Sequence, residues 1–330
     1  MRAIVCQAFA KPESLILAEV APLASPRRAE VVIDVAAAGV NFADNLMVAG
    51  QYQVKPALPF SPGFEAAGKV RACGTDVTRV RPGDRVLAVA DHGGFAEQML
   101  AQESNVIPIP EAMDFATAAS FAIAYGTSHG ALRWRANLQP GEVLLVHGAA
   151  GGVGLTAVEI GKAIGAVVIA TASTAKKLAI AKLHGADHLI DSSRDDIRDR
   201  VKEICQGRGA DVVYDPIGGG TFDASLRCMN WNGRIVIVGF AGGKVPQIPA
   251  NILLVKNIAA LGFYWGSYRQ HRPDLLREEF EERFEWWRAG KLKPHVSEQF
   301  ELSQAAEALR LLSERKSTGK VVLTTGLAVD

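Results

Sequence analysis

The chain has 330 residues, of which 36 are basic and 35 acidic, so its formal net charge at pH 7 is +1. A balance this close to zero argues against the basic surface that binds a phosphate backbone, and we do not expect nucleic acid as the main partner. Hydrophobic residues make up 48% of the chain and glycine occurs 32 times, which is typical of a compact, turn-rich globular protein. No apolar run approaches the length of a membrane span, so we expect no membrane partner and a cytoplasmic location.

The four cysteines are far apart in the sequence and form no C-x-x-C pair. This spacing predicts reduced thiols rather than a disulfide framework or a zinc knuckle. The seven histidines show no metal-binding spacing. We expect them, His92 and His129 included, at the surface or in turns.

The first part of the chain, up to about residue 121, has the pattern of short strands separated by turns. Residues 31–35 are strand-like, and the Pro-Gly-Asp turn at 82–84 is followed, after Arg85, by an apolar run at 86–89. This pattern predicts a β-rich domain.

From about Leu138 onward, predicted strands and helices alternate. Each strand is a continuous apolar run bounded by glycine or an acidic residue, as in parallel strands that are buried on both faces. Six such strands joined by crossovers predict a doubly wound α/β fold with a parallel sheet. The strands are expected at 143–146, 167–171, 188–190, 211–214, 235–238 and 258–263, and the helices at 153–164, 175–184, 196–205 and 221–229.

The rest of the chain contains two helical patterns, at 273–290 and 303–315, and a final strand pattern at 321–325. This is too little for a third domain, and we expect it to pack back onto the first one. The predicted organisation is a β-rich domain over 1–123, an α/β domain over 124–265, and a return segment over 266–330 that completes the first domain.

A glycine-rich turn joins the first predicted strand of the α/β domain to its first helix. Residues 148–154 read GAAGGVG. In such a turn Gly151 and Gly152 let the backbone approach a pyrophosphate, whose charge lies at the helix N-terminus, and Gly154 permits close packing of helix on strand. Ala149 occupies the first place of the G-x-G-x-x-G pattern, which is a departure from it. Because the turn lies between a strand and a helix, we predict a dinucleotide site at Ala149, Gly151, Gly152, Val153 and Gly154.

The end of the second strand of this domain bears on the choice between the two nicotinamide cofactors. An NAD site usually has an acidic residue about 20 positions past the first glycine. Residues 169–177 read IATASTAKK and contain no acid. A hydroxyl and a lysine attract a 2′-phosphate, so Ser173 and Lys177 are expected to select NADPH. A solvated helix lysine is the alternative reading for Lys177.

Six short motifs are spread along the chain. They are AAGVNFAD at 37–44, GQY at 50–52, PGFEAAG at 62–68, PGDRV at 82–86, the turn at 148–154, and DPIGG at 215–219. Over nearly the whole chain this order resembles the medium-chain dehydrogenases/reductases, and more closely their zinc-free NADPH:quinone oxidoreductases, the zeta-crystallin-like branch. The resemblance implies a GroES-like β-rich catalytic domain and a Rossmann domain with a six-stranded sheet.

The resemblance also shows which metal ligands this chain lacks. Zinc enzymes of the family hold their catalytic metal with a cysteine in the segment that matches 39–44 and a histidine in the one that matches 63–65, where this chain has Asn41 and Phe64. A phenyl ring has no lone pair and an amide is a poor zinc ligand, so we expect no zinc. Without a Lewis acid the substrate must already be electrophilic, as quinones and α,β-unsaturated carbonyls are.

Further site residues are implied by the resemblance alone. Asn41 and Tyr52 are expected beside the nicotinamide as donors to the developing oxyanion, with a turn-stabilising amide and a packed loop tyrosine as the alternatives. Thr127 is expected to contact the nicotinamide or to cap a helix. Phe240 is expected at the cofactor crevice or in the core, and Arg315 at the 2′-phosphate or on the surface.

Three functions stay open at this point. The first is an NADPH-dependent quinone or enone reductase. The second is an enoyl thioester reductase of the same superfamily, and the third is a non-catalytic NADPH-binding protein. Relatives commonly form dimers at the sixth strand, so we also expect a homodimer.

Overall fold

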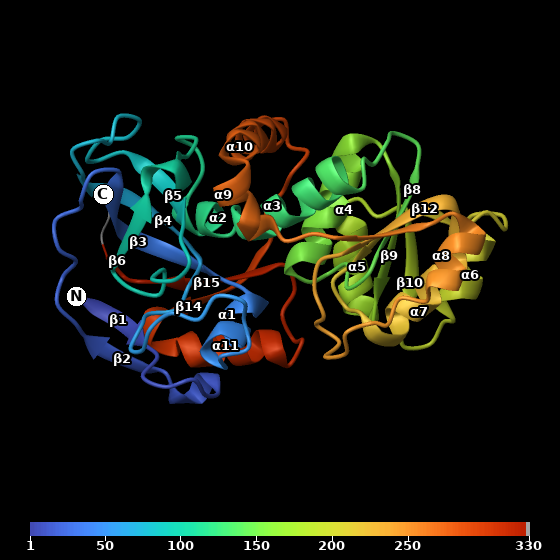
Figure 1. The fold of residues 1–330 in the computed structure, drawn as a ribbon, viewed down its shortest axis with the longest axis horizontal. Coiled ribbons are helices and arrows are strands. Elements are labelled where there is room, and N and C mark those ends of the chain that lie inside the picture. Colours follow the sequence, from blue (N-terminus) through green and yellow to red (C-terminus); the bar gives the residue numbers. More distant parts are fainter. Residues whose placement is uncertain (328–330) are drawn as a thin grey trace. The chain divides into compact units, whose positions relative to one another are not determined.

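The computed structural model describes residues 1–327, and the chain divides into two compact units. Unit 1 comprises Met1–Ile123 together with the chain from Pro294 onward, and unit 2 comprises Ala124–Lys293. Residues 266–293, which the sequence analysis assigned to the return segment, belong to unit 2. Figure 1 shows the elements of both units in the colours of the sequence.

The strands of unit 1 form one large sheet and one small one. They are β1 (Arg2–Val5), β2 (Ile16–Glu19), β3 (Glu30–Val40), β4 (Glu65–Cys73), β5 (Arg85–Val89), β6 (Gln98–Gln102), β7 (Val106–Pro108), β14 (Val296–Glu301) and β15 (Lys320–Thr324). The seven-stranded sheet has the order β14-β15-β3-β4-β5-β7, with β6 also paired to β3. Its pairs are antiparallel except for β14 with β15, and β1 and β2 form the separate antiparallel pair. The return of β14 and β15 to this sheet completes unit 1.

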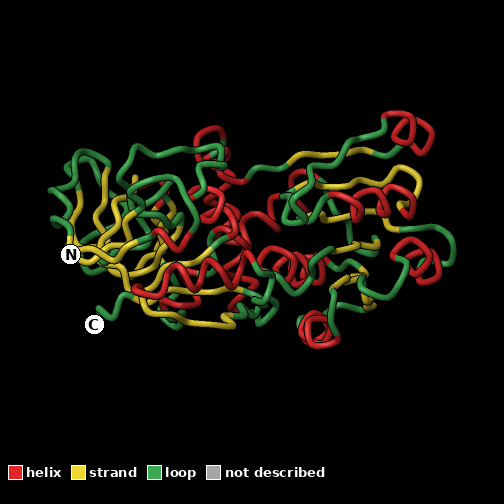
Figure 2. The backbone as a smooth tube through the Cα atoms, turned by 90° about the horizontal axis from the view of Figure 1, so that it is seen from below, coloured by secondary structure: helices red, strands yellow, loops and turns green. Residues whose placement is uncertain are grey.

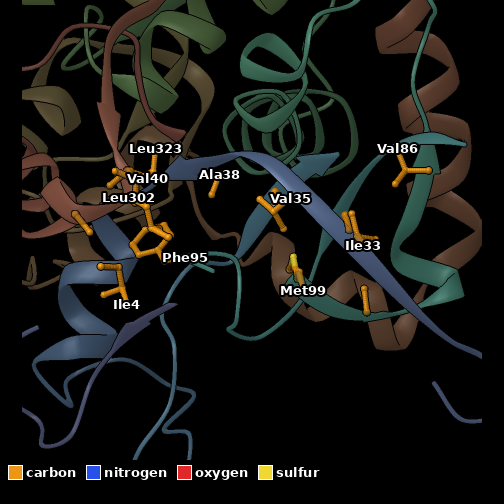
Figure 3. Packing of buried hydrophobic residues seen from close by; sticks show 14 of the residues in the cluster. Ile4, Ile33, Val35, Ala38, Val40, Val86, Phe95, Met99, Leu302 and Leu323 are labelled. Atoms are coloured by element: carbon orange, nitrogen blue, oxygen red, sulfur yellow. The ribbon is translucent and has the colours of Figure 1, made fainter. Parts of the chain in front are cut away.

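The core of unit 1 is built around the long strand β3. Ile33 and Val35 lie two residues apart on one face of the strand and are fully buried. Figure 3 shows Met99 next to this face, and Phe95 packed near Val40 at the other end of the strand. Burying a large aliphatic or aromatic side chain stabilises the fold by about 1.5 to 3 kcal/mol. The apolar alternation of 31–35 therefore sets which face of the sheet is internal.

Short helices cover the ends of the sheet in unit 1. They are α1 (Phe42–Val48), α2 (Phe115–Ala119), α11 (Ala305–Ser313) and the 3₁₀ turns η1 (Pro12–Ser14), η2 (Glu103–Asn105) and η5 (Leu302–Gln304). Helix α1 follows β3 with a single intervening residue, Asn41, whose backbone N–H donates to Asp44 Oδ2 at 2.7 Å. This bond starts the helix at the end of the strand, because it uses a donor that the helix itself leaves unpaired.

Unit 2 contains the predicted doubly wound sheet. Its strands are β8 (Val143–Val146), β9 (Val167–Ala172), β10 (His188–Asp191), β11 (Ala210–Asp215), β12 (Met229–Ile237) and β13 (Ala259–Gly262). All neighbours are parallel in the order β10-β9-β8-β11-β12-β13. This is the strand order of a dinucleotide-binding sheet, in which the order reverses next to the first strand, β8. The predicted fold class is confirmed.

Helices lie on both sides of the strands of unit 2 (Figure 2). The helical segments of unit 2 are α3 (Ile123–Gly130), which starts at the last residue of the first segment of unit 1, the π-turn η3 (Ala131–Arg135), α4 (Gly152–Ile164), α5 (Ala175–Leu183), α6 (Ile197–Ile204), α7 (Gly219–Cys228), α8 (Ala250–Lys256), the turn η4 (Trp265–Ser267), α9 (Tyr268–His271) and α10 (Pro273–Arg288). The sequence did not predict α8, because its apolar residues 252–255 are consecutive and have no amphipathic period; Ile252 and Leu253 pack partly buried against the core, whereas others are largely exposed. Leu254 and Val255, for example, are 79% and 78% exposed.

Two expectations about single residue types have different outcomes. The cysteines are free, and Cys6, Cys205 and Cys228 are buried while Cys73 is partly exposed. The expectation that histidines lie at the surface or in turns is wrong for His129 and His147, which are buried within unit 2. Both ring nitrogens of His147 are hydrogen-bonded to hydroxyl groups, and His129 Nε2 lies 2.7 Å from Glu282 Oε2; hydrophobic periodicity reveals neither contact. Over residues 1–327 there is no helix with the length and hydropathy of a membrane span.

Gly68 on β4 provides a test of the sheet in unit 1. Its partner strand β3 has a bulge between Val35 and Ala37, and a Cβ at Gly68 would lie 1.9 Å from the backbone oxygen of Asp34. We expect Gly68→Ala to lower the free energy of unfolding by on the order of 3 kcal/mol, because backbone cannot move away as a flexible side chain can.

Urea unfolding measures this effect, with Gly262→Ala on β13 as the control. Nothing lies within 4 Å of a Cβ at Gly262, and alanine there is expected to change the stability by less than about 1 kcal/mol. Equal effects of the two substitutions would contradict the close approach at the bulge.

Candidate active site

The turn after β8 has the geometry of an anion-binding loop. Gly151 is the N-cap of α4, and the Leu155 N–H donates to the Gly151 oxygen at 2.8 Å. A Cβ at Gly154 would lie 2.1 Å from the oxygen of Gly148, so this position requires glycine. The first N–H groups of α4 have no partner within the helix and point out of its N-terminus. The predicted residues Gly151, Gly152, Val153 and Gly154 thus lie where a pyrophosphate would be bound.

Ala149, the departure from the glycine pattern, is explained by its surroundings. Its side chain is fully buried, and its N–H donates to the Thr171 oxygen at 3.0 Å. This bond to β9 continues the pairing of the sheet beyond the end of β8. The positive φ in this part of the turn falls on Gly148, at 58°, and not on Ala149. Alanine is therefore compatible with the turn.

His147 connects the end of β8 to its neighbours. Its Nδ1 lies 3.0 Å from Thr171 Oγ1 and its Nε2 lies 2.7 Å from Ser225 Oγ. Burial lowers the pKa of His147 to about 4, so the ring is neutral at pH 7. Ser225 Oγ also donates to the Thr221 oxygen, which leaves Nε2 of the ring to donate to Ser225. A neutral histidine thus links β8, β9 and α7 below the glycine turn.

Asp215 shapes a second loop at the same edge of the sheet. It ends β11 and accepts hydrogen bonds from the N–H groups of Ile217 and Gly218, at 2.8 and 3.0 Å. Gly218 has a φ of 73°, which a glycine adopts at low cost. The DPIGG motif is therefore a turn held by its own aspartate, and its Ile217 lies 3.1 Å from where a Cβ of Gly148 would be.

Thr127 lies in the middle of α3, so the helix-cap alternative for it is wrong. The next residue, Ser128, donates to the Val153 oxygen at 2.8 Å and lies 2.7 Å from Thr156 Oγ1. Its hydroxyl is also 2.9 Å from the Tyr214 hydroxyl. This buried network attaches α3 to the first turn of α4 through Ser128, the residue that follows Thr127.

The residues predicted to select the cofactor lie just after β9. Ser173 is exposed, and the Lys177 N–H donates to Thr174 Oγ1 at 3.3 Å at the start of α5. An acid that the sequence analysis did not consider, Asp191, pairs in register with Ala172 at the end of β10. Its carboxylate accepts from the hydroxyl and N–H of Ser193, at 2.6 and 3.0 Å, and these bonds lower its pKa. Asp191 is thus already hydrogen-bonded within its own turn.

Phe240 follows β12 and is 40% exposed, so the core alternative for it is wrong. Its oxygen accepts from the Gly243 N–H at 2.8 Å, which makes it part of a tight turn. The ring lies 3.3 Å from where a Cβ of Gly218 would be. Phe240 therefore lies next to the loop that Asp215 holds.

In unit 1 the central feature is a buried cluster of Asn41, Glu65 and Lys320. Lys320 Nζ donates to Asn41 Oδ1 at 2.6 Å and to Glu65 Oε1 at 2.9 Å. Asn41 Nδ2 donates to the same Glu65 oxygen at 2.8 Å. The other Glu65 oxygen accepts from the Ile123 N–H at 2.8 Å. All three side chains are at least 90% buried, with exposed fractions of 8%, 1% and 4%.

The register of three strands produces this cluster. Gly39 pairs with Glu65 across β3 and β4, and Val40 pairs with Val321 across β3 and β15. Asn41 follows Val40 and Lys320 precedes Val321. Because β3 and β15 are antiparallel, Asn41 and Lys320 meet at one end of the sheet. A Cβ at Gly39 would lie 2.5 Å from Glu65 Oε1, which shows that this glycine leaves the space for the carboxylate.

Asp44 is a second buried carboxyl group beside this cluster. It is fully buried, and burial raises its pKa to about 7, although the Asn41 N–H and the charge of Lys320 act in the opposite direction. Near pH 7 this group is therefore divided between its neutral and ionised forms.

Tyr52 lies next to the cluster through its ring. It makes an edge-on contact with Phe64, with 5.2 Å between ring centroids, and Phe64 directly precedes Glu65. Asn41 thus contacts Glu65 and Tyr52 contacts Phe64, and these two partners are consecutive residues. Arg315, in contrast, follows α11 with a φ of 56° and is exposed. It belongs to unit 1, whereas Ser173 and Lys177 belong to unit 2.

Four residues that organise these sites were not predicted from the sequence: Lys320, Glu65, His147 and Asp215. Glu65 and Asp215 belong to the motifs PGFEAAG and DPIGG, but a buried role is not visible in a short motif. Lys320 begins an apolar strand pattern and had no signal of its own, because its partners are far away in the sequence. His147 directly precedes the glycine turn, and that position was the available signal.

Comparisons with known proteins agree with this architecture. Residues 27–111 match the alcohol dehydrogenase GroES-like domain, and residues 152–282 match a zinc-binding dehydrogenase domain. A quinone oxidoreductase-like protein 2 homolog of Nematostella vectensis is 43% identical over 326 residues, covering 98% of this chain and 89% of the relative.

Two solved structures are similar over their whole length. A quinone oxidoreductase of Pseudomonas syringae has a TM-score of 0.92 and 35% identity, with 98% of this chain and 99% of that chain covered. The quinone oxidoreductase of Escherichia coli, solved in complex with NADPH, has a TM-score of 0.91 and 31% identity, with 98% and 100% covered.

A GroES-like unit combined with a Rossmann unit defines a medium-chain dehydrogenase/reductase. Within this superfamily the chain belongs to the zinc-free quinone oxidoreductase branch, since the relatives match both units together. The resemblance inferred from the sequence is confirmed.

Zinc does not fit the residues that occupy the catalytic-metal positions of the superfamily. Phe64 offers no lone pair, and the Oδ1 of Asn41 and the Oε1 of Glu65 both accept from the Lys320 ammonium. A metal cation at this place would have to displace a buried positive charge. Across residues 1–327, no group of three or more histidine, cysteine, aspartate or glutamate side chains is arranged to hold a metal ion.

The raised pKa of Asp44 makes the stability of the protein depend on pH. Its ordinary value is 3.8 and its value in the fold is about 7, so the folded protein binds this proton more tightly than the unfolded chain does. The resulting stability is fully present below about pH 4 and is lost as the pH rises through 7. Asp44→Asn removes this loss, and we expect its advantage over wild type to grow by on the order of 2 to 3 kcal/mol between pH 5 and pH 8.

Denaturant unfolding at several pH values measures this difference. Asp223→Asn on the exposed side of α7 is the matched control, and its difference from wild type is expected to stay constant. A constant difference for Asp44→Asn as well would show that this carboxyl group is ionised throughout the range.

Proposed function

We propose that the chain is an NADPH-dependent, metal-free reductase that transfers hydride to quinones or other electron-poor conjugated carbonyls. The observation that carries this proposal is the cluster at the metal positions of the superfamily, where the Lys320 ammonium binds Asn41 and Glu65. Without a Lewis acid, a plain aldehyde or ketone is not activated, whereas a conjugated system spreads the charge that arrives with hydride.

The glycine turn of unit 2 supports a dinucleotide cofactor, and NADPH is the one we propose. When bound, NADPH supplies the hydride. The N-terminus of α4 would hold the pyrophosphate, and Ser173 and Lys177 would bind the 2′-phosphate. The Escherichia coli relative was solved with NADPH. Phe240, next to the loop held by Asp215, and Thr127, next to Ser128 in α3, are proposed to contact the cofactor, and Arg315 is proposed as a further 2′-phosphate ligand.

Asn41 and Tyr52 are the proposed hydrogen-bond donors to the substrate oxygen. Their neighbours Glu65 and Phe64 fix them in one segment of unit 1. Donors that are held in place before the reaction stabilise a developing oxyanion without a further reorganisation cost. No strong acid is required in this scheme, because solvent or a hydroxyl group supplies the proton.

The direct test measures NADPH consumption by the purified protein, after metal analysis, with a panel of acceptors. We expect turnover with quinones or enones and none with simple aldehydes. Turnover restricted to enoyl thioesters would move the substrate to the second candidate class. NADPH binding without turnover of any acceptor would indicate a non-catalytic protein and overturn the proposal.

Lys177 is tested by its removal. We expect Lys177→Met to raise KM for NADPH by about 10-fold to 100-fold, because a charge-assisted bond to phosphate contributes about 1.5 to 3 kcal/mol. KM for NADH should change less than about twofold, since NADH has no 2′-phosphate. The neighbouring Lys176→Met, an exposed lysine of the same helix, is the control and should change neither value. Equal changes of both KM values for Lys177→Met would refute a role in phosphate selection.

Tyr52 is tested by removing its hydroxyl. If solvent supplies the proton, Tyr52→Phe lowers kcat less than about tenfold, because the ring still packs on Phe64. Steady-state rates with a quinone measure this. A loss of several orders of magnitude would instead make the phenol the obligatory acid.

We also propose that the chain is a cytoplasmic homodimer. Strand β13 is at the edge of the six-stranded sheet formed by the described residues, and α8, which precedes it, exposes Leu254 and Val255. An unpaired strand edge beside an apolar surface is suited to pairing with a second copy. Light scattering at micromolar concentration measures the mass, and a stable monomer would contradict the proposal.

A further inference from the structure

The ammonium group of Lys320 is completely hydrogen-bonded. Besides Asn41 Oδ1 and Glu65 Oε1, it donates to the Val40 oxygen at 3.1 Å. An ammonium has three donors and no acceptor, so these three bonds use all of it. A buried charge with this many bonds is fixed in position, because moving it would leave both the ammonium and the Glu65 carboxylate unpaired.

This arrangement leaves one orientation for the Asn41 amide. Lys320 only donates and the ionised Glu65 only accepts, so Oδ1 must face Lys320 and Nδ2 must face Glu65. Rotating the amide by half a turn would direct Nδ2 at the ammonium and Oδ1 at the carboxylate. Both bonds, at 2.6 and 2.8 Å, would then become repulsive contacts.

One of the two Nδ2 hydrogens remains weakly held. The first donates to Glu65 at 2.8 Å, whereas the second has the Gly39 oxygen at 3.4 Å as its acceptor within residues 1–327. A bond of that length is near the limit of a hydrogen bond. The second hydrogen can therefore change to a better acceptor with little loss.

We propose that Lys320 is a positioning residue, which fixes the Asn41 amide so that its second Nδ2 hydrogen is available to the oxygen of a conjugated carbonyl. This inference rests on the proposed function. A cation on Oδ1 also polarises the amide and makes its N–H a stronger donor, since linked hydrogen bonds reinforce one another. Lys320 thus acts on the substrate through Asn41 and does not touch it.

A double-mutant cycle tests this link. Lys320→Met keeps the length of the side chain and removes the charge, and Asn41→Ala removes the amide. We expect each to lower kcat with a quinone by about 10-fold to 100-fold, with KM for NADPH changed less than about twofold. The double variant should be within about twofold of Asn41→Ala alone, because Lys320 acts through that residue. Lys316→Met, an exposed lysine in the same unit, is the control.

A second variant addresses folding. Lys320→Met leaves the Glu65 charge unpaired, whereas Lys320→Met combined with Glu65→Gln removes both charges of this ion pair, and we expect this double variant to unfold at a higher temperature than Lys320→Met alone. It should still show the loss of kcat, because its amide is no longer oriented by charge. NADPH binding measured by fluorescence should match wild type in every variant.

The outcomes separate the two proposals. Suppose that the wild type is active. If Lys320→Met keeps the wild-type kcat, or if the losses of Lys320→Met and Asn41→Ala multiply in the double variant, the role of Lys320 is overturned and the proposed function stays intact. Wild-type kcat in Lys320→Met combined with Glu65→Gln overturns that role as well, as does the failure of both Lys320 variants to fold, which would show a structural role. A wild type without turnover overturns the proposed function and the role of Lys320 together.

Discussion

The hydrogen-bonded ammonium of Lys320 is the constraint on which the candidate site of unit 1 depends. It joins the first residue of β15 to the residue after β3 and to the first residue of β4. Removing a charge from water costs several kcal/mol, and the interior compensates for this only with good geometry and satisfied partners. Here the carboxylate, an amide oxygen and a backbone oxygen supply them. Charge balance, rather than apolar packing, therefore fixes the position of Asn41.

The same balance accounts for the chemistry that we propose. The superfamily has a metal position at this end of the sheet, and this chain has an internal cation bound to the residues around it. An ammonium held by a carboxylate and an amide does not coordinate a substrate oxygen. It orders the hydrogen-bond donors that meet the oxygen, so the carbonyl must bring its own electrophilicity. We propose conjugated carbonyls as substrates because the ammonium orders hydrogen-bond donors and does not itself coordinate the substrate oxygen.

The glycine turn of unit 2 depends on close backbone approach rather than on a buried ion pair. Gly154 lets α4 approach the oxygen of Gly148, and the neutral ring of His147 connects the strands and α7 beneath the turn. Ser128 attaches α3 to the same turn. These contacts lie within unit 2 and fix the shape of the turn that we propose as the pyrophosphate site. A site that is ordered beforehand loses less conformational entropy when it binds.

Local signals in the sequence were enough to predict the six-stranded sheet. Each strand was a buried apolar run, and the glycine turn lay between a strand and a helix. The extent of β12 was less clear, because residues 229–234 include Asn230, Trp231 and Asn232 and do not look like a buried strand. Helix α8 gave no amphipathic signal, since its apolar residues 252–255 are consecutive, with two partly buried and two exposed.

The candidate site was predicted only in part. Asn41 and the glycine turn were found because motifs contain them. Lys320 lies 279 positions from Asn41, and a contact over that distance depends on strand register rather than on local pattern. Asp191 was not considered because it follows the neighbouring strand, and pairing places it beside Ala172. Long-range pairing is the information that composition and periodicity do not contain.

The most direct measurement follows deuterium from NADPH labelled at nicotinamide C4 into cyclohex-2-enone, with a chelator present and cyclohexanone as the saturated comparison. We expect the label at the β-carbon of the product, because conjugation activates that carbon without a metal, and no reduction of cyclohexanone. Label at the carbonyl carbon, or reduction of both ketones at similar rates, would contradict a site that orders donors around an electrophilic substrate.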